Sequence, residues 1–210
     1  MRPSSPVATA TGRRETRRTE TRARLLQAAR ELIGEGGFDA VTIADVTERA
    51  EVGFGTFYGY FETKDALVRA VILDAVEQLA EANDALTAGL DDPAEVMAVA
   101  VRHSLGIVHR DPVFAGFIVQ VALVGDDDLW NALRQRMLRD VKRGVQAGRF
   151  SAERVAVVGH MIGGSVFAVL RAKLHGELGR TADAQVAASV LVLLGLPEDE
   201  AVEIANRRLP

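Results

Sequence analysis

The sequence predicts an all-α protein. Apolar side chains recur at spacings of three and four in several segments, and no stretch shows the alternation of apolar and polar residues that marks a half-buried strand. Ala, Leu, Val and Arg dominate, which favours helix overall. Hydrophobic residues make up 48% of the 210 residues and aromatic residues 5%, so we expect a substantial and mostly aliphatic core.

The first elements are a tail and a helix. Residues 1–16 offer little to bury, and we expect them to form a disordered basic arm. A helix is expected from about Arg17, ending at the glycine-rich segment 34–37, because glycine tolerates the left-handed exit conformation. Its predicted apolar face consists of Leu25, Ala28, Ala29, Leu32 and Ile33.

Residues 42–61 predict two short helices joined by a bend. Thr42 and Asp45 have the spacing of a capping box at the start of the first helix. The bend falls at residues 51–53, and the second helix is expected over 54–61. This is the pattern of a helix-turn-helix, whose second helix enters the major groove of DNA.

The later chain reads as a series of helices. A long helix is expected from Lys64 to about Leu86. Asp92 and Asp111 each precede a proline, which predicts a capped helix start at both positions. The remaining helices are expected at about 126–148, 151–174 and 183–194 and from Pro197 onward.

Charge is distributed unevenly along the chain. The net charge is −4, but residues 1–30 hold eight arginines and two glutamates, a charge of +6, so the other 180 residues carry −10. A basic end on an acidic body is expected when that end contacts phosphate. The alternative is a solvated tail without a partner.

Composition also excludes several classes of protein. There is no cysteine, which excludes a disulfide framework, a thiol nucleophile and cysteine-ligated zinc. No signal peptide is visible, and the longest apolar runs are far shorter than the ~20 residues of a membrane span. We therefore expect a soluble cytoplasmic protein without a membrane partner.

The helix-turn-helix supplies candidate contacts to double-stranded DNA. A helix that reaches the floor of the major groove needs small residues in its first turn, and Gly53, Gly55 and Thr56 meet that need. Phe57 and Phe61 lie four apart and should anchor the helix inward. The side chains expected to face DNA are Phe54, Tyr58, Tyr60, Lys64 and Thr42.

These residues resemble the tetracycline-repressor-like (TetR) family of bacterial regulators. The resemblance covers Arg22 to about Ala70 and centres on the string AEVGFGTFYGYF of residues 50–61, followed by Lys64. It implies that the positions matching Thr42, Phe54, Gly55, Thr56, Tyr58, Tyr60 and Lys64 face DNA. The chain differs from the family's usual pattern at Glu51, where glycine is common, and at Gly53, where serine is frequent.

The resemblance further implies a C-terminal bundle that dimerises and binds a small molecule. Small residues in segment 151–174 and an apolar stripe in 183–194 predict the interface of a homodimer. The interface candidates are Gly159, Gly163, Val186, Val190 and Leu194. The alternative is that these residues face the core of their own subunit.

A pocket for a small hydrophobic effector is expected among the middle helices. Its candidate lining residues are Met97, His103, Phe114, Phe117, Ile118, Val121, Trp130, Leu133, Met137 and Phe167. Each of them is individually as compatible with plain core. His103 or His160 is a candidate hydrogen-bonding partner of the ligand.

No pattern in the sequence predicts catalysis, a cofactor or a metal site. The four histidines lack metal-ligand spacing, and Ser165 lacks the final glycine and the strand of a nucleophile elbow. We therefore expect a ligand-responsive regulator that acts as a repressor, with a basic arm (1–16), a helix-turn-helix domain (17–66) and a ligand-binding and dimerisation domain (67–210). The alternatives are a regulator without an effector, and a helical ligand-binding protein or enzyme with a vestigial helix-turn-helix.

Overall fold

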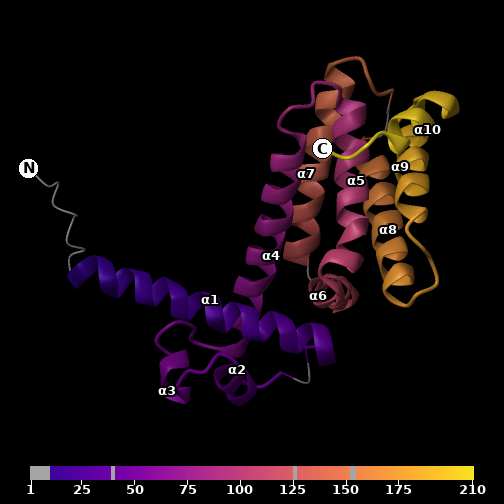
Figure 1. Ribbon diagram of the computed structural model, residues 1–210. Coiled ribbons are helices and arrows are strands. Elements are labelled where there is room, and N and C mark those ends of the chain that lie inside the picture. The colour runs from indigo at the N-terminus through magenta and orange to yellow at the C-terminus, as the bar shows by residue number, and fades with distance from the viewer. Residues whose placement is uncertain (1–9, 39–40, 125–126, 152–154) are drawn as a thin grey trace, which may run out of the picture. The chain divides into compact units, whose positions relative to one another are not determined.

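The computed structural model describes residues 10–38, 41–124, 127–151 and 155–210, with side chains at all of them except 10–11 and 122–134. All regular secondary structure in these ranges is helical, as the sequence predicts (Figure 1). The chain forms two compact units, Met1–Val71 and Ile72–Pro210. The boundary between them falls inside α4 (Lys64–Thr87).

The first unit contains α1 (Ala10–Gly36), α2 (Ile43–Arg49), α3 (Phe54–Phe57) and the start of α4. α1 begins seven residues before the expected Arg17. Residues 10–16 are therefore helical, and the prediction that they belong to a disordered arm is wrong. Residues 1–9 lie outside the described part of the chain. Regular α-helix in α3 ends at Phe57 instead of residue 61, and turns continue from there to Tyr60.

The core of the first unit is small and well buried. Side chains from all four helices contribute to it, and the largest of them are fully enclosed. Its most buried members include Leu25, Ile33, Val46, Phe57 and Leu67. The apolar face predicted for α1 accounts for the α1 residues among them, so periodicity correctly identified the side of α1 that packs inward.

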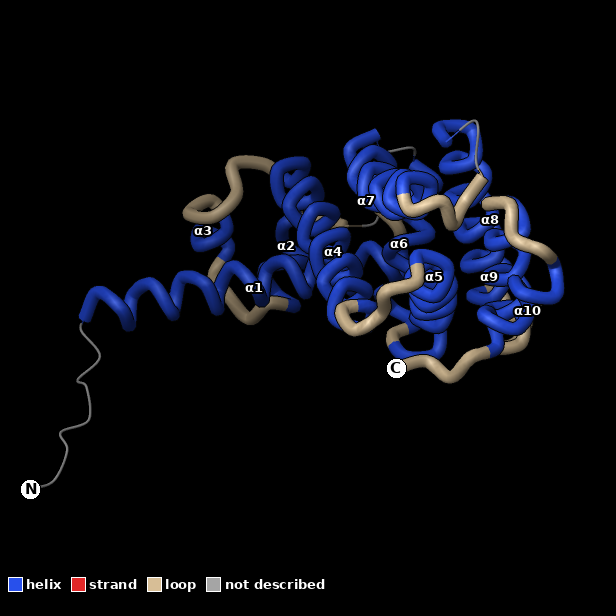
Figure 2. The backbone as a smooth tube through the Cα atoms, turned by 90° about the horizontal axis from the view of Figure 1, so that it is seen from above, coloured by secondary structure: helices blue, strands red, loops and turns tan. Residues whose placement is uncertain are grey.

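The second unit contains the rest of α4 and six further helices. These are α5 (Pro93–Arg110), α6 (Pro112–Val124), α7 (Asp127–Gln146), α8 (Val155–Leu174), α9 (Ala182–Leu193) and α10 (Glu198–Asn206). Figure 2 looks nearly along α5, α7, α8 and α9, which run side by side, whereas Figure 1 shows α6 lying across their ends. The predicted caps are confirmed, because Asp92 Oδ1 accepts from the Ala94 N–H at 2.9 Å and Asp111 Oδ1 accepts from the Phe114 N–H at 2.9 Å.

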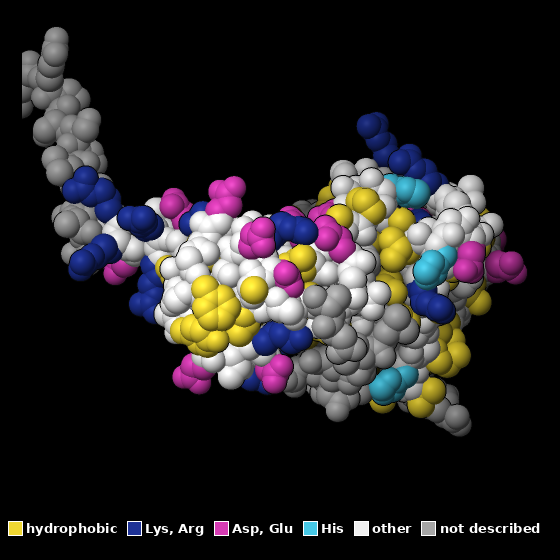
Figure 3. All heavy atoms as spheres, turned by 90° about the horizontal axis from the view of Figure 1, so that it is seen from below, with side chains coloured by type: hydrophobic (Ala, Val, Ile, Leu, Met, Phe, Trp, Pro, Cys, Tyr) yellow, Lys and Arg dark blue, Asp and Glu magenta, His cyan; other side chains and the backbone are white. Residues whose placement is uncertain are grey.

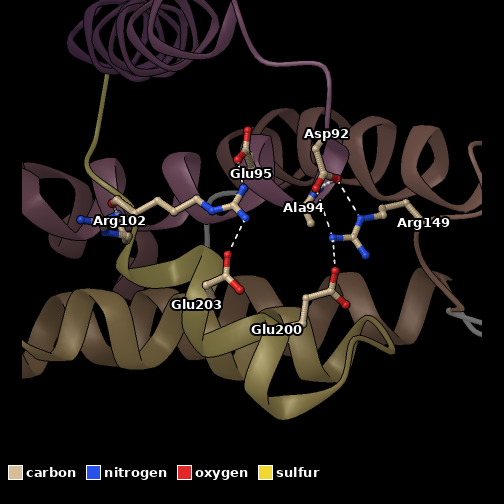
Figure 4. A network of polar contacts seen from close by, with 8 residues as sticks. Asp92, Ala94, Glu95, Arg102, Arg149, Glu200 and Glu203 are labelled. Carbon is tan, nitrogen blue, oxygen red and sulfur yellow. Dashed lines mark hydrogen bonds and ion pairs between the residues drawn. The ribbon is translucent and has the colours of Figure 1, made fainter.

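Arginines fasten the C-terminal helix to the bundle (Figure 4). The Arg149 guanidinium donates two bonds to Asp92, at 2.9 and 3.1 Å, and one to Glu200 on α10 at 2.7 Å. Partial burial acts to raise the pKa of Asp92, but the bonds from Arg149 and from the Ala94 N–H outweigh it and hold that pKa below its usual value. One aspartate therefore both caps α5 and links it to α10.

α8 is an unusually apolar helix for one that is so little covered. Residues Val155–Leu174 are long and apolar enough to cross a membrane by length and composition, yet only 17% of the most apolar window is buried within the chain. Val157 and Met161 are 53% and 52% exposed. Much of the apolar surface of α8 is thus available to another molecule.

Candidate nucleic-acid interface

A capping box fixes the start of α2. The Thr42 hydroxyl donates to Asp45 Oδ2 at 2.6 Å and accepts from the Asp45 N–H at 3.2 Å, while the Thr42 N–H donates to Asp45 Oδ2 at 3.2 Å. The predicted capping box is confirmed. Because the hydroxyl proton of Thr42 is already donated to Asp45, the free N–H groups of the first turn of α2 are the better donors for a phosphate at this point.

The aromatic residues of α3 divide between the core and the surface. Phe57 is fully buried and Phe61 is 6% exposed, whereas Phe54 and Tyr58 are 54% and 53% exposed. The Tyr58 ring contacts Phe57 edge-on at a centroid distance of 5.4 Å and Phe54 at 5.9 Å. The buried Phe57 ring therefore supports Tyr58, and Tyr58 in turn contacts Phe54, so the two exposed rings form one surface.

The approach to the first turn of α3 is open. A Cβ added at Gly55 would meet nothing within 4 Å, and Thr56 is exposed. Gly53 precedes α3 in extended conformation, and no side chain caps the helix. Gly53, Gly55 and Thr56 therefore leave the backbone accessible to a base edge or a phosphate. Tyr60 is half-buried.

Lys64 has a structural role that the sequence did not reveal. Its ammonium donates to the carbonyl oxygens of Phe38 at 3.1 Å and Val41 at 2.9 Å. It therefore ties the start of α4 to the segment between α1 and α2. Two of its three donors serve this tie and one is left for a phosphate, so the predicted contact of Lys64 with DNA stays a prediction.

A second tie was also missed from the sequence. Arg49, at the end of α2, donates to both carboxylate oxygens of Glu35 on α1 at 3.1 and 3.2 Å, and its Nη1 lies 3.4 Å from Glu31. The hydrogen bond from Arg49 lowers the pKa of Glu35. The i, i+4 spacing of Glu31 and Glu35 was visible, but nothing local indicated that both would face α2.

Basic side chains gather on the N-terminal half of α1. Every side chain from Arg13 to Glu20 is exposed, and Figure 3 shows Lys and Arg side chains concentrated next to the start of the described chain. On the same view, hydrophobic side chains reach the surface of the first unit. An exposed helix with aromatic tips thus lies in the same unit as a concentration of positive charge, as an interface with nucleic acid requires.

Comparison with known families identifies this arrangement. Residues 25–71 match the profile described as "Bacterial regulatory proteins, tetR family", and residues 92–207, more than half of the chain, match "Tetracyclin repressor-like, C-terminal domain". The chain belongs to the TetR family. It is accordingly a helix-turn-helix regulator of transcription, and the predicted resemblance is confirmed.

Individual relatives agree with this assignment. The crystal structure of RolR in complex with the ligand resorcinol has a TM-score of 0.71 and 38% identity, covering 93% of this chain and 98% of that one. UidR of Escherichia coli (strain K12) is 36% identical over 64 residues, 30% of this chain and 33% of that protein. The repressor KstR of Rhodococcus jostii (strain RHA1) is 29% identical over 107 residues, 51% of this chain and 50% of that protein. The chain thus spans a third to a half of these two relatives.

The second unit collects most of the predicted pocket residues. They lie on α5, α6, α7 and α8, whose mutual packing brings them together. Met97, Phe114, Phe117, Ile118 and Val121 are buried, and His103, Met137 and Phe167 are half-buried. The side chains of Trp130 and Leu133 lie outside the described part of the chain.

Two polar and aromatic features stand out among these residues. His103 Nδ1 lies 2.7 Å from Asn83 Oδ1 on α4. Since an amide oxygen only accepts, Nδ1 carries the proton. Burial, followed by the positive charge of Arg110, lowers the pKa of His103. The rings of Phe114 and Phe117 are stacked at a centroid distance of 6.3 Å, and both belong to α6.

The predicted interface residues need correction. Val190 and Leu194 are 3% and 0% exposed within the single chain, so they belong to its own core. Gly159 is buried as well, and a Cβ there would lie 2.5 Å from Cδ2 of Leu138 on α7. This glycine therefore allows close packing between α7 and α8. Gly163 and Val186 are half-exposed and remain candidates.

Proposed function

We propose that this TetR-family chain is a ligand-responsive repressor that binds a palindromic operator as a homodimer and dissociates when a small hydrophobic effector binds. One observation carries the DNA-binding part of this proposal, namely that Phe54 of α3 and Tyr58 directly after it are exposed, while Phe57 is buried and anchors the helix in the core. An anchored helix with an exposed first turn is what direct readout in a major groove requires.

The proposed contacts follow from exposure. Phe54 is placed to touch a thymine methyl group, and the Tyr58 hydroxyl to bond to a phosphate. Gly53, Gly55 and Thr56 let the backbone of α3 approach the base edges. Tyr60 is half-buried and contributes at the edge of this surface.

The dimer is proposed to form through the exposed face of α8 with the adjoining part of α9. Val157 and Met161 on α8 and Val192 on α9 are large apolar residues that are 43–53% exposed in the single chain. Gly164 and Ala168 continue the exposed line on α8. A second copy related by a two-fold axis would bury this surface, and it explains why so apolar a helix is so little covered.

The two-fold axis also determines the operator. Two copies of α3 related by that axis would read half-sites about 34–36 Å apart, the distance of one turn of DNA. The operator is therefore an inverted repeat. We place the protein in the cytoplasm, where it meets the chromosome.

The proposed effector is a small, largely apolar and aromatic molecule. α5 and α6 carry buried apolar residues of the predicted pocket, and the half-buried His103 of α5 is the polar residue among the pocket candidates. RolR, which covers nearly the whole chain at 38% identity, has been solved with resorcinol, a small aromatic diol. We therefore propose a phenol-like effector for this chain.

Effector binding releases DNA only if the effector prefers a different conformation. The free-energy shift equals the difference between its affinities for the two conformations, so tight binding without preference changes nothing. α4 runs across the boundary between the units, and the His103–Asn83 bond attaches it to α5 beside the predicted pocket. A ligand that takes over the His103 hydrogen bond would free α4 from that attachment.

Selection from a pool of random duplex DNA tests this function. The protein is expected to enrich an inverted repeat, and a phenol-like effector is expected to reduce binding to it. Phe54→Ala should lose the selected preference without losing helix content, and Tyr58→Ala should weaken binding to every duplex. If no sequence is enriched, or if enriched sequences lack two-fold symmetry, the proposed mode of binding is wrong; if no effector changes binding, the regulator acts without a small molecule.

A further inference from the structure

A groove in the first unit separates the N-terminal half of α1 from the turn before α3. One wall carries Arg14, Arg17, Arg18 and Arg24 of α1. The other wall is formed by residues 51–53 of the turn, by Thr56 of α3 and by Tyr60 after it. The groove therefore lies beside the helix proposed to read DNA, and four guanidinium groups line it.

The four arginines have no ion-pair partner among the described residues. Arg49, in the same unit, differs because it pairs with Glu31 and Glu35. Arginines spaced three or four residues apart on a helix, such as Arg14 and Arg18, repel each other. A helical segment without packing is only marginally stable in water. In the free protein, this part of α1 thus keeps unfavourable charges together, and a polyanion would relieve their repulsion.

Glu51 opposes this charge from the far wall. It has φ of 53°, and it is the one residue other than glycine with positive φ in the described part of the chain. This conformation is strained for a residue with a Cβ and free for glycine. The exposed carboxylate makes no hydrogen bond or ion pair with a described residue that would offset the strain. The position thus combines a strained backbone with a negative charge in a basic groove.

We propose that this groove is a second DNA-binding surface, which holds the phosphodiester backbone of one strand while α3 occupies the major groove, and that Glu51 limits its affinity for that strand. The proposal rests on the DNA-binding function proposed above. Guanidinium groups match phosphate geometry and bind it in bidentate fashion. Such contacts carry no sequence information, so the groove would act on any duplex.

The charge balance gives Glu51 its effect. The groove holds four arginines against Glu15 and Glu51, so a neutral residue in place of Glu51 raises its formal charge from +2 to +3. A regulator must also dissociate from DNA, and an effector typically changes the affinity of a protein for its other ligand about 5–150-fold. A built-in negative charge keeps the sequence-independent part of DNA affinity low enough for a change of that size to release the protein.

Two substitutions with opposite expected signs test the groove. The full chain is titrated with a fluorescent random-sequence duplex at several salt concentrations, and anisotropy gives the dissociation constant. Arg17→Ala should weaken binding several-fold and flatten the slope of log affinity against log salt by about 0.9, the value for one phosphate contact. Glu51→Gln, which keeps the size and the strained backbone, should tighten binding several-fold and steepen the slope.

Matched controls separate the groove from general charge. Arg13→Ala removes an exposed arginine of the same helix that does not line the groove, and Glu48→Gln removes an exposed glutamate of α2. Both should change affinity clearly less than Arg17→Ala and Glu51→Gln, since neither side chain lines the groove that holds the strand. Circular dichroism should show the same helix content in all four variants.

The proposal requires both effects. It is overturned if Arg17→Ala or Glu51→Gln leaves affinity unchanged, or if Arg13→Ala weakens binding as much as Arg17→Ala. Tyr58→Ala, measured on the selected operator, separates this outcome from failure of the proposed function. A loss there with silent groove variants rejects the groove alone, whereas a wild-type chain that binds neither duplex rejects both.

Discussion

Removing the Lys64 ammonium tests the structural role of this residue against a role in phosphate binding. Lys64→Met keeps the length of the side chain but leaves the carbonyl oxygens of Phe38 and Val41 without their donor. A hydrogen bond to a charged group contributes about 1.5–3 kcal/mol. Lys64 is only half-buried, and water can replace part of this loss. We therefore expect the two bonds together to contribute about 2 kcal/mol to the stability of the first unit.

Native-state hydrogen exchange measures this loss in the first unit alone. The Val46 amide is bonded to Thr42 at the start of α2, and the Ala50 amide is bonded to Val46 at its end. Both should exchange about 30-fold faster in Lys64→Met, because each 1.4 kcal/mol changes an equilibrium tenfold. Arg69→Met, an exposed change on the same helix, serves as the control. Unchanged exchange, together with a salt slope of DNA binding reduced by about 0.9, would refute the tie and support the phosphate contact.

Three further changes test other parts of the structure. Thr42→Ala removes the capping box and should lower the free energy of unfolding, measured by thermal unfolding, by about 1 kcal/mol. Thr42→Ser, which keeps the hydroxyl, should preserve the stability of wild type. Burial lowers the folded-state pKa of His103, so its neutral ring contributes fully to stability above the unfolded pKa of about 6.5, and this contribution is lost as pH falls. In His103→Gln, stability should therefore decline less as pH falls. Arg149→Met should destabilise the second unit by about 1 kcal/mol. It should also reduce the loss of stability that wild type shows as acid protonates Asp92, because Arg149 and the Ala94 N–H together lower the pKa of Asp92 and only the Ala94 bond remains.

Local signals in the sequence predicted the helices well. Asp92 and Asp111 cap helices where their position before proline indicated, and Thr42 with Asp45 forms the expected box. Such signals act within one turn of backbone, so the sequence contains all the information needed. Glu51, where the family usually has glycine, adopts a backbone conformation that favours glycine, with φ of 53°.

Contacts between distant segments were not predictable in the same way. Lys64 was predicted to begin a helix and to face DNA. Its ammonium also donates to carbonyl oxygens more than 20 residues earlier in the chain, which was not predicted. Backbone carbonyls leave no mark in an amino-acid sequence. The same holds for Arg49, whose carboxylate partners lie on α1.

Periodicity could not decide which molecule covers an apolar face. The stripe of α9 was correctly seen as apolar, but Val190 and Leu194 pack inside their own chain. Gly159 likewise serves close packing between α7 and α8. Apolar residues that face a partner follow the same spacing as core residues, and only exposure in the single chain distinguishes Val157 and Met161 as candidates for the interface.

The ratio of two dissociation constants tests the central claim most directly. The claim is that the exposed surface of α3 reads DNA sequence, and the ratio compares random duplex with the selected operator at one salt concentration. Phe54→Ala should reduce this ratio by about tenfold, since a specific base contact contributes about 1–3 kcal/mol. Tyr58→Ala should instead weaken binding to both duplexes, because a phosphate contact carries no sequence information. A ratio that stays at the wild-type value in Phe54→Ala would show that another surface reads the operator, and would contradict the account.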